Sequence, residues 1–573
     1  MRFYTIMLAA LMLSGCQNRT KTGPTPLATV CNPVNISYRF CIDEPSRREA
    51  ADPSVVWFNG RYFLFASKSG GYWHSKDLGS WEFIETEQIP AEEYAPTVVG
   101  IGEELYFLAS SNEKSTIYKT SDPLSGQWVV AVEELETPVW DPMFFFENDK
   151  LYLYWGCSNT NPLYGVEVDY RNNFKFLGKP VELLKSNTAQ NGWEVPGDYN
   201  TMTHQSPWIE GAWVNKINGK YYLQYAGPGT EFKSYSDGVY TSDNPLGPFS
   251  LQQHNPFAYR PEGFIAGAGH GSTFSDQYGN LWHIGTLTIS QKHMFERRLG
   301  IFPVFVSNDG ILYTTTRYGD YPYFIPQKKI SSYEDISTGW MLLSFRKPVE
   351  VSSAIDSLPA VNITDENIRT YWAASGTNSG EYVIIDLQNP SEVKALQVNF
   401  AEHNTNIFGR KKGIKYRYVI DCSDDKTTWK VITDRSKNET DNSHDYIQLA
   451  NAVTCRYVRI TALEVADGNF ALSDFRIFGL GNGQKPAIVK SFTAQRNSND
   501  RRSVTLNWEK SATATGYNIR YGTASDKRYL DYMVYGDTSI TINSLNTNSK
   551  YFFTIDSFNE NGISLGEITV QID

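Results

Sequence analysis

The sequence ADPSVVWFNGRYFLF, residues 51–65, decides the fold of the first half of the chain. It consists of an apolar run, an Asn59-Gly60 turn signal and a tyrosine-rich run, a pattern typical of a β-hairpin. Further copies end in aromatic runs at residues 105–108, 151–154, 220–223 and 280–284. A hairpin repeated at such a period, with several strands per unit, predicts the blades of a five-bladed β-propeller.

Each copy opens with a small or ionisable residue. The opening pairs are Asp52-Pro53, Ala95-Pro96, Asp141-Pro142, Glu210-Gly211 and His270-Gly271. Radial repetition places equivalent positions around one axis, so we expect three acids and a histidine to meet at one mouth. A single Asp-Pro pair is a common turn element. Several ionisable groups at one register predict a functional site instead.

Composition limits what the rest of the chain can be. The 573 residues are too many for a single core, so about three domains are expected. Aromatic residues make up 14% of the chain, which suits both β-sheet cores and surfaces that stack on sugars. The formal net charge is −11 and the sequence has no basic stripe, which argues against a nucleic-acid partner.

The first residues are predicted to be a targeting signal. A short apolar stretch ends in Leu13-Ser14-Gly15-Cys16, which resembles a bacterial lipobox. The resemblance implies cleavage after residues 1–15, acylation of Cys16 and a protein anchored by lipid to the bacterial cell envelope. Gln17 after Cys16 does not suggest retention in the inner membrane, so the outer membrane is expected. We also expect a monomer. An ordinary secretory signal is the alternative. Residues 16–44 are predicted to form a tether and a lead-in to the propeller.

Short alternating strands continue beyond the propeller, which we expect to span residues 45–340. The patterns over residues 345–480 and 485–573 are typical of two β-sandwich domains. The predicted fold class is therefore all-β: a five-bladed propeller followed by two sandwiches.

The order of motifs in the first sandwich resembles a discoidin-type (coagulation factor type C) domain. Such domains often bind sugars or lipid surfaces and often hold a structural calcium ion. Asp365, Thr370 and Asp474 match the ligand positions, and their oxygen atoms are ligands that calcium prefers. Polar residues that form turns are the alternative interpretation of these three.

The second sandwich resembles a fibronectin type III domain, with Trp508 expected in its core and Tyr551 as a candidate corner tyrosine. Export permits disulfides, but pairing cannot be deduced from sequence. Candidate pairs are Cys31 with Cys41 and Cys422 with Cys455. Cys157 is expected to be a buried small hydrophobe.

Acids gathered in an aromatic pocket can hydrolyse a glycosidic bond. One carboxyl must be protonated so that it can donate to the leaving oxygen, and another must be ionised so that it can activate water or attack. A third carboxylate can keep the donor protonated through like-charge repulsion. Asp52, Asp141 and Glu210 would supply such a set.

Residues of about 45–325 resemble glycoside hydrolase family 43, through ADPSV (51–55), DPMFFFENDKLYL (141–153), EGAWV (210–214) and GHGS (269–272). The resemblance implies inversion, with Asp52 as general base, Glu210 as general acid and Asp141 as the residue that tunes the pKa of Glu210. In an inverting site the base and acid lie about 6.5–9.5 Å apart. No cofactor is required for catalysis.

Further predictions concern the pocket walls. The resemblance places His270 beside substrate or an ion, and a simple strand cap is the alternative. It places Arg297 against substrate. Arg298 is adjacent, and a surface charge is the alternative for one of these two arginines. Residues 190–208 form an insertion that we expect to act as a lid or subsite wall. Its Glu194 is a rival for the acid role. Candidate wall residues are Trp73, Trp140 and Trp193, although blade cores could also hold them.

The function predicted first is an inverting hydrolase that acts on polysaccharide or oligosaccharide side chains, of the α-L-arabinofuranosidase or β-D-xylosidase type. A β-galactosidase-type activity on the same fold is an alternative. A retaining fructan hydrolase would carry an arginine-aspartate-proline motif in mid-chain, which the sequence lacks. A non-catalytic glycan-binding lipoprotein is the remaining alternative, and the intact acid set argues against it.

Overall fold

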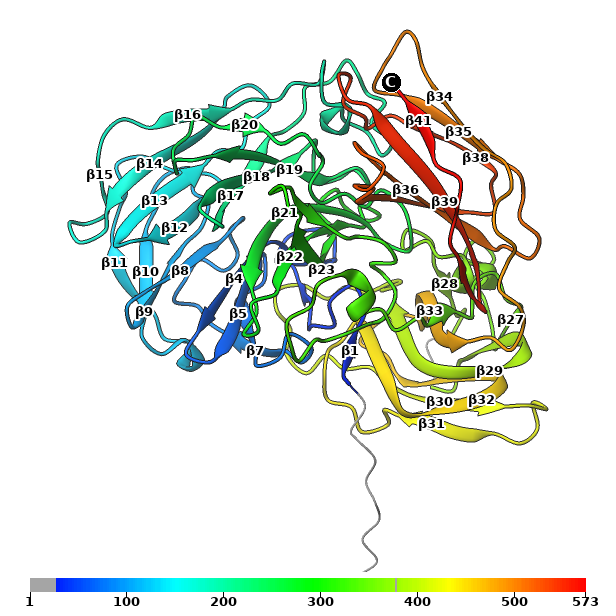
Figure 1. The fold of residues 1–573 in the computed structure, drawn as a ribbon. Helices are drawn as coiled ribbons and strands as arrows, with labels where there is room; N and C mark the ends of the chain where they lie inside the picture. The colour runs from blue at the N-terminus through cyan, green and yellow to red at the C-terminus, as the bar shows by residue number, and fades with distance from the viewer. Residues whose placement is uncertain (1–26, 377–378) are drawn as a thin grey trace, which may run out of the picture.

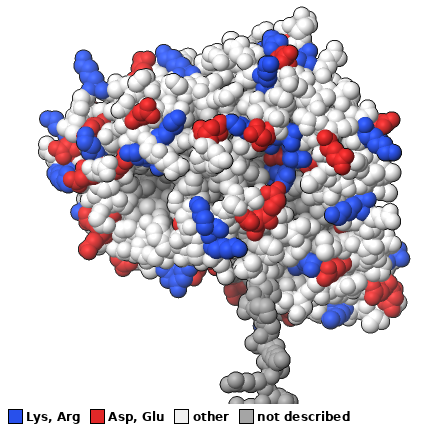
Figure 2. All heavy atoms as spheres, in the orientation of Figure 1, with Lys and Arg blue, Asp and Glu red and all other residues white. Residues whose placement is uncertain are grey.

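The computed structural model describes residues 27–376 and 379–573 and is almost entirely β-structure (Figure 1). The predicted signal, Cys16 and the tether up to residue 26 lie outside the described residues. Over the described ranges, no helix has the length and apolar character needed to cross a membrane. Figure 2 shows Lys and Arg interspersed with Asp and Glu over the face drawn, with no continuous basic stripe on that face.

Five consecutive antiparallel sheets form the predicted propeller. Their innermost strands, β4, β8, β12, β17 and β21, contact one another in a closed ring, which gathers the strand starts at one mouth. The blades are β4 (Ala51–Phe58), β5 (Arg61–Ser67), β6 (Gly71–Ser75), β7 (Glu82–Glu85); β8 (Thr97–Ile101), β9 (Glu104–Leu108), β10 (Ile117–Thr120), β11 (Val129–Val132); β12 (Met143–Glu147), β13 (Lys150–Trp155), β14 (Leu163–Asp169), β15 (Lys175–Phe176), β16 (Val181–Leu184); β17 (Glu210–Ile217), β18 (Lys220–Gly227), β19 (Ser236–Ser242), β20 (Ser250–Leu251); β21 (Ala266–Ser275), β22 (Leu281–Thr288), β23 (Arg297–Val306), β24 (Leu312–Thr314).

The hairpin turns form where the sequence predicted them. Asn59 and Gly60 have φ of 46° and 76°, and Asn218 and Gly219 have φ of 51° and 84°. Two successive positive φ values characterise the tight turn whose twist matches that of the flanking strands, and Asn-Gly tolerates them best. The local sequence therefore fixes the hairpins.

The lead-in packs between the propeller and the first sandwich. Val34 N–H donates to the Leu299 carbonyl of blade five at 2.9 Å, and Thr29 N–H donates to Gln448 of the sandwich at 2.9 Å. Tyr38 is fully buried. The lead-in strands are β1 (Thr29–Val30), which pairs with β25 (Tyr323–Phe324), and the hairpin β2 (Arg39–Phe40) with β3 (Arg48–Glu49).

The discoidin-type region is built around two long strands that pair with each other over most of their length. Its core includes the fully buried Trp372 and Phe475. The strands are β26 (Met341–Leu342), β27 (Val349–Val351), β28 (Trp372–Ala373), β29 (Tyr382–Phe400), β30 (Arg417–Ser423), β31 (Lys430–Asp434), β32 (His444–Glu464) and β33 (Ala471–Leu480).

The last region is a sandwich of a three-stranded and a five-stranded sheet. Trp508 lies in its core, and the Tyr551 hydroxyl accepts a hydrogen bond from Asn546 N–H at 2.9 Å, which confirms the core and corner predictions. The strands are β34 (Phe492–Arg496), β35 (Val504–Trp508), β38 (Ser539–Ile542) and β36 (Gly516–Gly522), β37 (Leu530–Tyr535), β39 (Tyr551–Asn559), β40 (Gly562–Ser564), β41 (Val570–Ile572). Short 3-10 helices are η1 (Pro123–Ser125), η2 (Gly192–Glu194), η3 (Tyr333–Asp335) and η4 (Ala360–Thr364).

The insertion of residues 190–208 leans on the last sandwich instead of lying free over the mouth. Gly192 N–H donates to the Leu545 carbonyl at 3.0 Å, and Thr547 N–H donates to the Gln190 carbonyl at 2.9 Å. A Cβ atom on Gly192 would lie 2.4 Å from the Asn543 carbonyl oxygen, so only glycine permits this approach. The C-terminal sandwich is therefore packed directly against a segment of the propeller mouth.

Candidate active site

One backbone conformation recurs at the start of all five blades. In every blade, one residue near the start of the innermost strand has a left-handed φ between 42° and 61°. These residues are Asp52, Ala95, Asp141, Gly211 and His270. A left-handed φ is uncommon outside glycine, and its repetition shows that blade geometry imposes it at the mouth.

This repetition corrects the predicted register of the acids. Bulges after Ala51, Glu210 and Gly269 align Asp52 with Gly211 and His270, so Glu210 lies one position earlier than expected. A Cβ atom on Gly211 would lie 2.6 Å from the His270 ring. Glycine at the inward position therefore leaves room for the histidine, while the fourth blade presents its acid from the preceding position.

Asp52 is buried and held as an anion. Its carboxylate accepts hydrogen bonds from the Ser67 hydroxyl at 2.6 Å and from Arg297 Nη1 at 3.1 Å, and it lies 3.4 Å from His270 Nδ1. Burial favours the neutral acid, but Arg297, His270 and Ser67 together outweigh it and lower the pKa of Asp52. An ionised carboxylate is the state that a general base requires.

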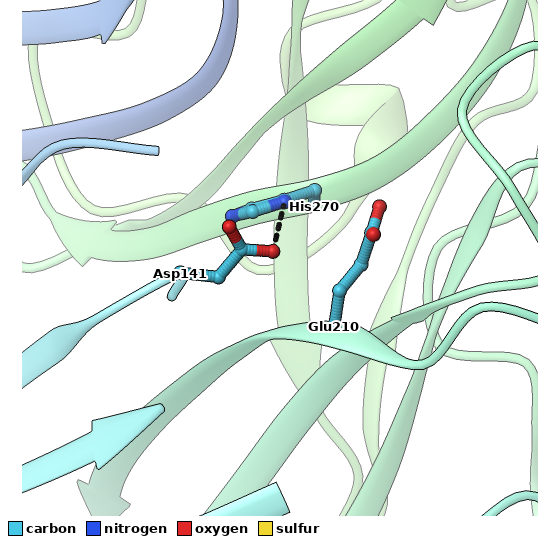
Figure 3. A group of neighbouring side chains, drawn as sticks. All are labelled: Asp141, Glu210 and His270. Carbon is cyan, nitrogen blue, oxygen red and sulfur yellow. Dashed lines mark ion pairs between the residues drawn. The ribbon is translucent and has the colours of Figure 1, made fainter. Parts of the chain in front are cut away.

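Asp141 and Glu210 form the opposite side of the site with His270 (Figure 3). Donor atoms of these three residues all lie within 4.8 Å of one another. Burial raises the pKa of Asp141 to about 7; His270 opposes this shift, and the charges on Glu210 and Asp52 add to it. Asp141 thus retains its proton at a pH where Asp52 is ionised.

Glu210 has two partners that sequence reasoning missed. The Tyr235 hydroxyl donates to Oε1 and the Cys157 thiol donates to Oε2, the latter at 3.2 Å. Cys157 is partly exposed at the pocket, so its prediction as a buried hydrophobe was wrong. Its position directly after a repeat strand was the only sequence signal, and that signal does not distinguish core from mouth.

Blade-to-blade hydrogen bonds fix the backbone that carries these groups. Ser110 Oγ accepts from Asp141 N–H at 2.9 Å, and Thr286 Oγ1 accepts from Asp52 N–H at 2.9 Å. The Asp237 carboxylate accepts from His270 N–H at 2.7 Å. In each case an oxygen of the preceding blade holds the left-handed residue of the next.

A pocket of about 390 Å³ opens beside Glu210. Its apolar walls include Trp140, which was predicted, and Trp208, which ends the insertion. Met294 and Phe295, from the loop between β22 and β23, and Glu231 also line the pocket. Aromatic faces flanking a carboxyl group form a surface that suits a sugar ring.

Three other predictions are corrected by burial. Trp73 is fully buried in a blade core, where it packs against Phe83, and does not line the pocket. Trp193 is also fully buried, against Tyr225 of blade four. Glu194 is buried too and accepts a hydrogen bond from Asn191 at 3.0 Å, away from the pocket lining. A large side chain next to a turn can point into the pocket or into a blade core. The packing of the blades directs these three side chains into the interior.

The two arginines have separate partners. Arg297 lies between Asp52 and Glu49, with its Nη2 2.6 Å from the latter carboxylate. Arg298 is buried and donates to His444 of the first sandwich at 2.9 Å, so it is not a surface charge. Arg297 therefore acts on the base, while its neighbour joins two domains.

The five described cysteines carry free thiols, so neither predicted disulfide forms in this structure. Cys31 donates to the Asp320 carbonyl at 3.2 Å, whereas Cys41 contacts Glu49. Cys422 and Cys455 lie on neighbouring strands, and a hydrogen bond between their thiols lowers the pKa of Cys422.

The two predicted ion sites differ in how well they fit a cation. At the mouth, Asp141, Glu210 and His270 have suitably spaced donor atoms, but a bound dication would stabilise ionised carboxylates and suppress the protonated acid. Those residues thus fit a proton-transfer site better than a resident ion.

In the first sandwich, the Thr370 hydroxyl donates to the Asp365 carboxylate at 2.7 Å. Glu366 N–H, which lies between these two residues in the sequence, donates to the Asp474 carboxylate at 3.1 Å. The buried Oδ1 of Asp474 has no hydrogen-bond partner among the described residues. Calcium prefers oxygen ligands of this type, and its presence stays a prediction.

A five-bladed propeller whose mouth holds Asp52, with a lowered pKa, across from Asp141, with a raised pKa, and Glu210 has an arrangement that suits a glycoside hydrolase. Sequence comparison agrees. Residues 45–312 match the model for glycosyl hydrolases family 43, so the propeller region is similar to that family. Residues 348–474 match the F5/8 type C domain and residues 488–571 the fibronectin type III domain.

Individual relatives are distant. A beta-D-galactofuranosidase xynD of Aspergillus niger is 23% identical over 221 residues, which cover 35% of this chain and 63% of the relative. Among solved structures, a glycoside hydrolase is 17% identical, with a TM-score of 0.45, and covers 77% of this chain and 100% of its own. A xylan beta-1,4-xylosidase from Bacillus halodurans C-125 is 14% identical, with a TM-score of 0.40, and the match covers 95% of this chain and 97% of the xylosidase.

Proposed function

We propose that the chain is an inverting glycosidase that removes single α-L-arabinofuranosyl or β-D-xylosyl units from polysaccharide or oligosaccharide side chains. The observation that carries the proposal is the electrostatic asymmetry of the mouth. Arg297 and His270 keep Asp52 ionised, whereas Asp141, against Glu210, has its pKa raised to about 7. Two carboxyl environments whose pKa values are pushed apart define a base and an acid.

The proposed reaction has one chemical step. Asp52 accepts a proton from a water molecule as the water oxygen bonds to the anomeric carbon. The bond between that carbon and the leaving oxygen breaks on the opposite face, and Glu210 gives its proton to the leaving oxygen. Solvent then returns both carboxyl groups to their starting states. Tyr235 and Cys157 orient the Glu210 carboxyl through their hydrogen bonds.

Asp141 is proposed to set the basic limb of the pH profile. With Asp141 charged, loss of the pair's proton is opposed by like-charge repulsion, so activity should fall as pH rises through about 7. Asp141→Asn removes that repulsion. We expect the basic limb of kcat/KM to move to lower pH by about one unit or more, measured between pH 4 and 9. An unmoved limb would remove Asp141 from this role.

A second candidate is hydrolysis of galactosyl units. The curated relative from Aspergillus niger is named a beta-D-galactofuranosidase, and this chain spans about 63% of that relative's length. The pocket beside Glu210 has about 390 Å³, which admits either a furanose or a pyranose ring. A substrate panel must therefore include galactofuranosides and galactopyranosides.

We also propose that the enzyme is a monomer tethered to the bacterial envelope, with outer-membrane residence, through a lipid on Cys16. The sequence LSGC that ends at this cysteine supports the proposal. The described chain begins at residue 27 with a lead-in that packs between the propeller and the first sandwich.

The experiment for the main proposal combines a panel of aryl glycosides and plant glycans with proton NMR of the first anomer released. Hydrolysis of an arabinofuranoside or xyloside with an inverted first product is the expected result. A product of retained configuration would exclude direct attack by water. Turnover confined to galactosides would select the second candidate and leave the acid and base assignments intact.

A further inference from the structure

One residue of the first sandwich contacts three segments that carry pocket walls. Arg369 Nη1 donates to the Asp198 carboxylate of the insertion at 2.8 Å, and its Nη2 donates to the Glu231 carbonyl at 3.4 Å. Its own carbonyl accepts a hydrogen bond from Gln291 Nε2 at 2.6 Å. These partners come from residues 190–208, the β18–β19 loop and the β22–β23 loop.

Each of the three segments also supplies lining to the pocket beside Glu210. The insertion ends at Trp208, the β18–β19 loop includes Glu231, and the β22–β23 loop carries Met294 and Phe295. The remaining wall, from Trp140 and its neighbourhood, belongs to blade three. Most of the lining is thus carried by segments that meet at a single residue from outside the propeller, two of them at its guanidinium and one at its backbone carbonyl.

Neighbouring contacts strengthen the same connection. Lys292 Nζ, three residues before Phe295, donates to the Glu402 carbonyl of the first sandwich at 2.6 Å. The start of the insertion is held by the last sandwich through the backbone bonds of Gln190 and Gly192. The loops that form the walls are therefore anchored on both accessory domains, which limits their motion relative to the acid.

We propose that Arg369 is a positioning residue that fixes the width of the substrate pocket, so that the accessory sandwich determines which sugars bind beside Glu210. The inference rests on the proposed function, since it assumes that this pocket receives substrate. A planar guanidinium suits the role because it can hold a carboxylate and a carbonyl at fixed angles at the same time. Lysine has a single charged atom and cannot reproduce both contacts.

The test compares Arg369→Gln and Arg369→Lys with Arg456→Gln, a matched arginine of the same sandwich that pairs with Asp386 at the surface. For Arg369→Gln we expect KM to rise about tenfold on the preferred aryl glycoside, with kcat changed less than about threefold. The KM of Arg369→Lys should lie between the KM of Arg369→Gln and that of the wild type. The KM of Arg456→Gln should equal that of the wild type.

A second readout does not depend on activity. Of the five described cysteines, only Cys157 is not buried, and it lines the pocket. Its alkylation by iodoacetamide, followed by mass spectrometry of the peptide that contains it, reports how open the walls are. Arg369→Gln should speed this alkylation several-fold, and Arg456→Gln should leave it unchanged.

Unchanged KM together with unchanged Cys157 alkylation in Arg369→Gln would overturn the inference. Should this variant unfold, Asp198→Asn removes the charge of its partner while conserving shape, and the same criteria apply to it. Failure of the proposed function is recognised separately: Glu210→Gln would keep full turnover in that case, whatever the arginine variants do.

Discussion

Glu210→Gln is expected to lower kcat by about 10³-fold on a substrate with a poor leaving group such as a natural oligosaccharide. Glutamine keeps the side-chain shape and can still accept a hydrogen bond from Tyr235, but it has no proton to give to the leaving oxygen. The loss should shrink to about tenfold on a dinitrophenyl glycoside, whose leaving group departs without protonation. Steady-state kinetics on the two substrates measures the difference.

Two comparisons make this result specific to acid catalysis. The exposed Glu87→Gln, on a blade-one loop, changes the same charge without touching the mouth and should leave kcat unchanged. Equal losses on both substrates for Glu210→Gln would contradict the acid role, because a damaged pocket does not distinguish leaving groups. The rival Glu194 is hydrogen-bonded within the fold and should affect stability instead.

Asp52→Asn is expected to reduce kcat by about 10³-fold on both substrates, because the attacking water must give up its proton whichever group leaves. The amide can keep a contact with Ser67 or Arg297 but cannot accept a proton from water. Exposed Asp243→Asn is the matched control. Turnover that survives in Asp52→Asn would require a base other than Asp52.

The same substitution should lower stability. Arg297 keeps its contact with Glu49 but loses a buried counter-charge, a change that costs about 3 kcal/mol. The pKa of Asp52 is lower in the folded chain, so its ionised form contributes stability above the ordinary aspartate pKa of about 3.9, and that contribution is lost as pH falls through the folded value. Urea unfolding of wild type and variant at pH 7 and at a pH well below 3.9, about pH 2.5, should therefore show a smaller difference at the lower pH.

Sequence reasoning reached the fold because its signals were local. The Asn-Gly turns and the tyrosine-rich strands specify hairpins through backbone preferences of adjacent residues, and their repetition implies closure into blades. The acids Asp52 and Asp141 were recognisable for the same reason, since each stands at a repeated strand start. These features could be predicted without knowing any long-range contact.

The tertiary structure decided what depends on side-chain direction and on contacts between distant segments. Glu210 reaches the site from one position before the repeat register, and Trp73 and Trp193 turn into blade cores. Cys157 meets Glu210, and Arg369 meets the pocket walls, across separations that no local pattern encodes. Bulges and blade packing set those directions, and both arise from the closed ring and the docked sandwiches, not from the order of neighbouring residues.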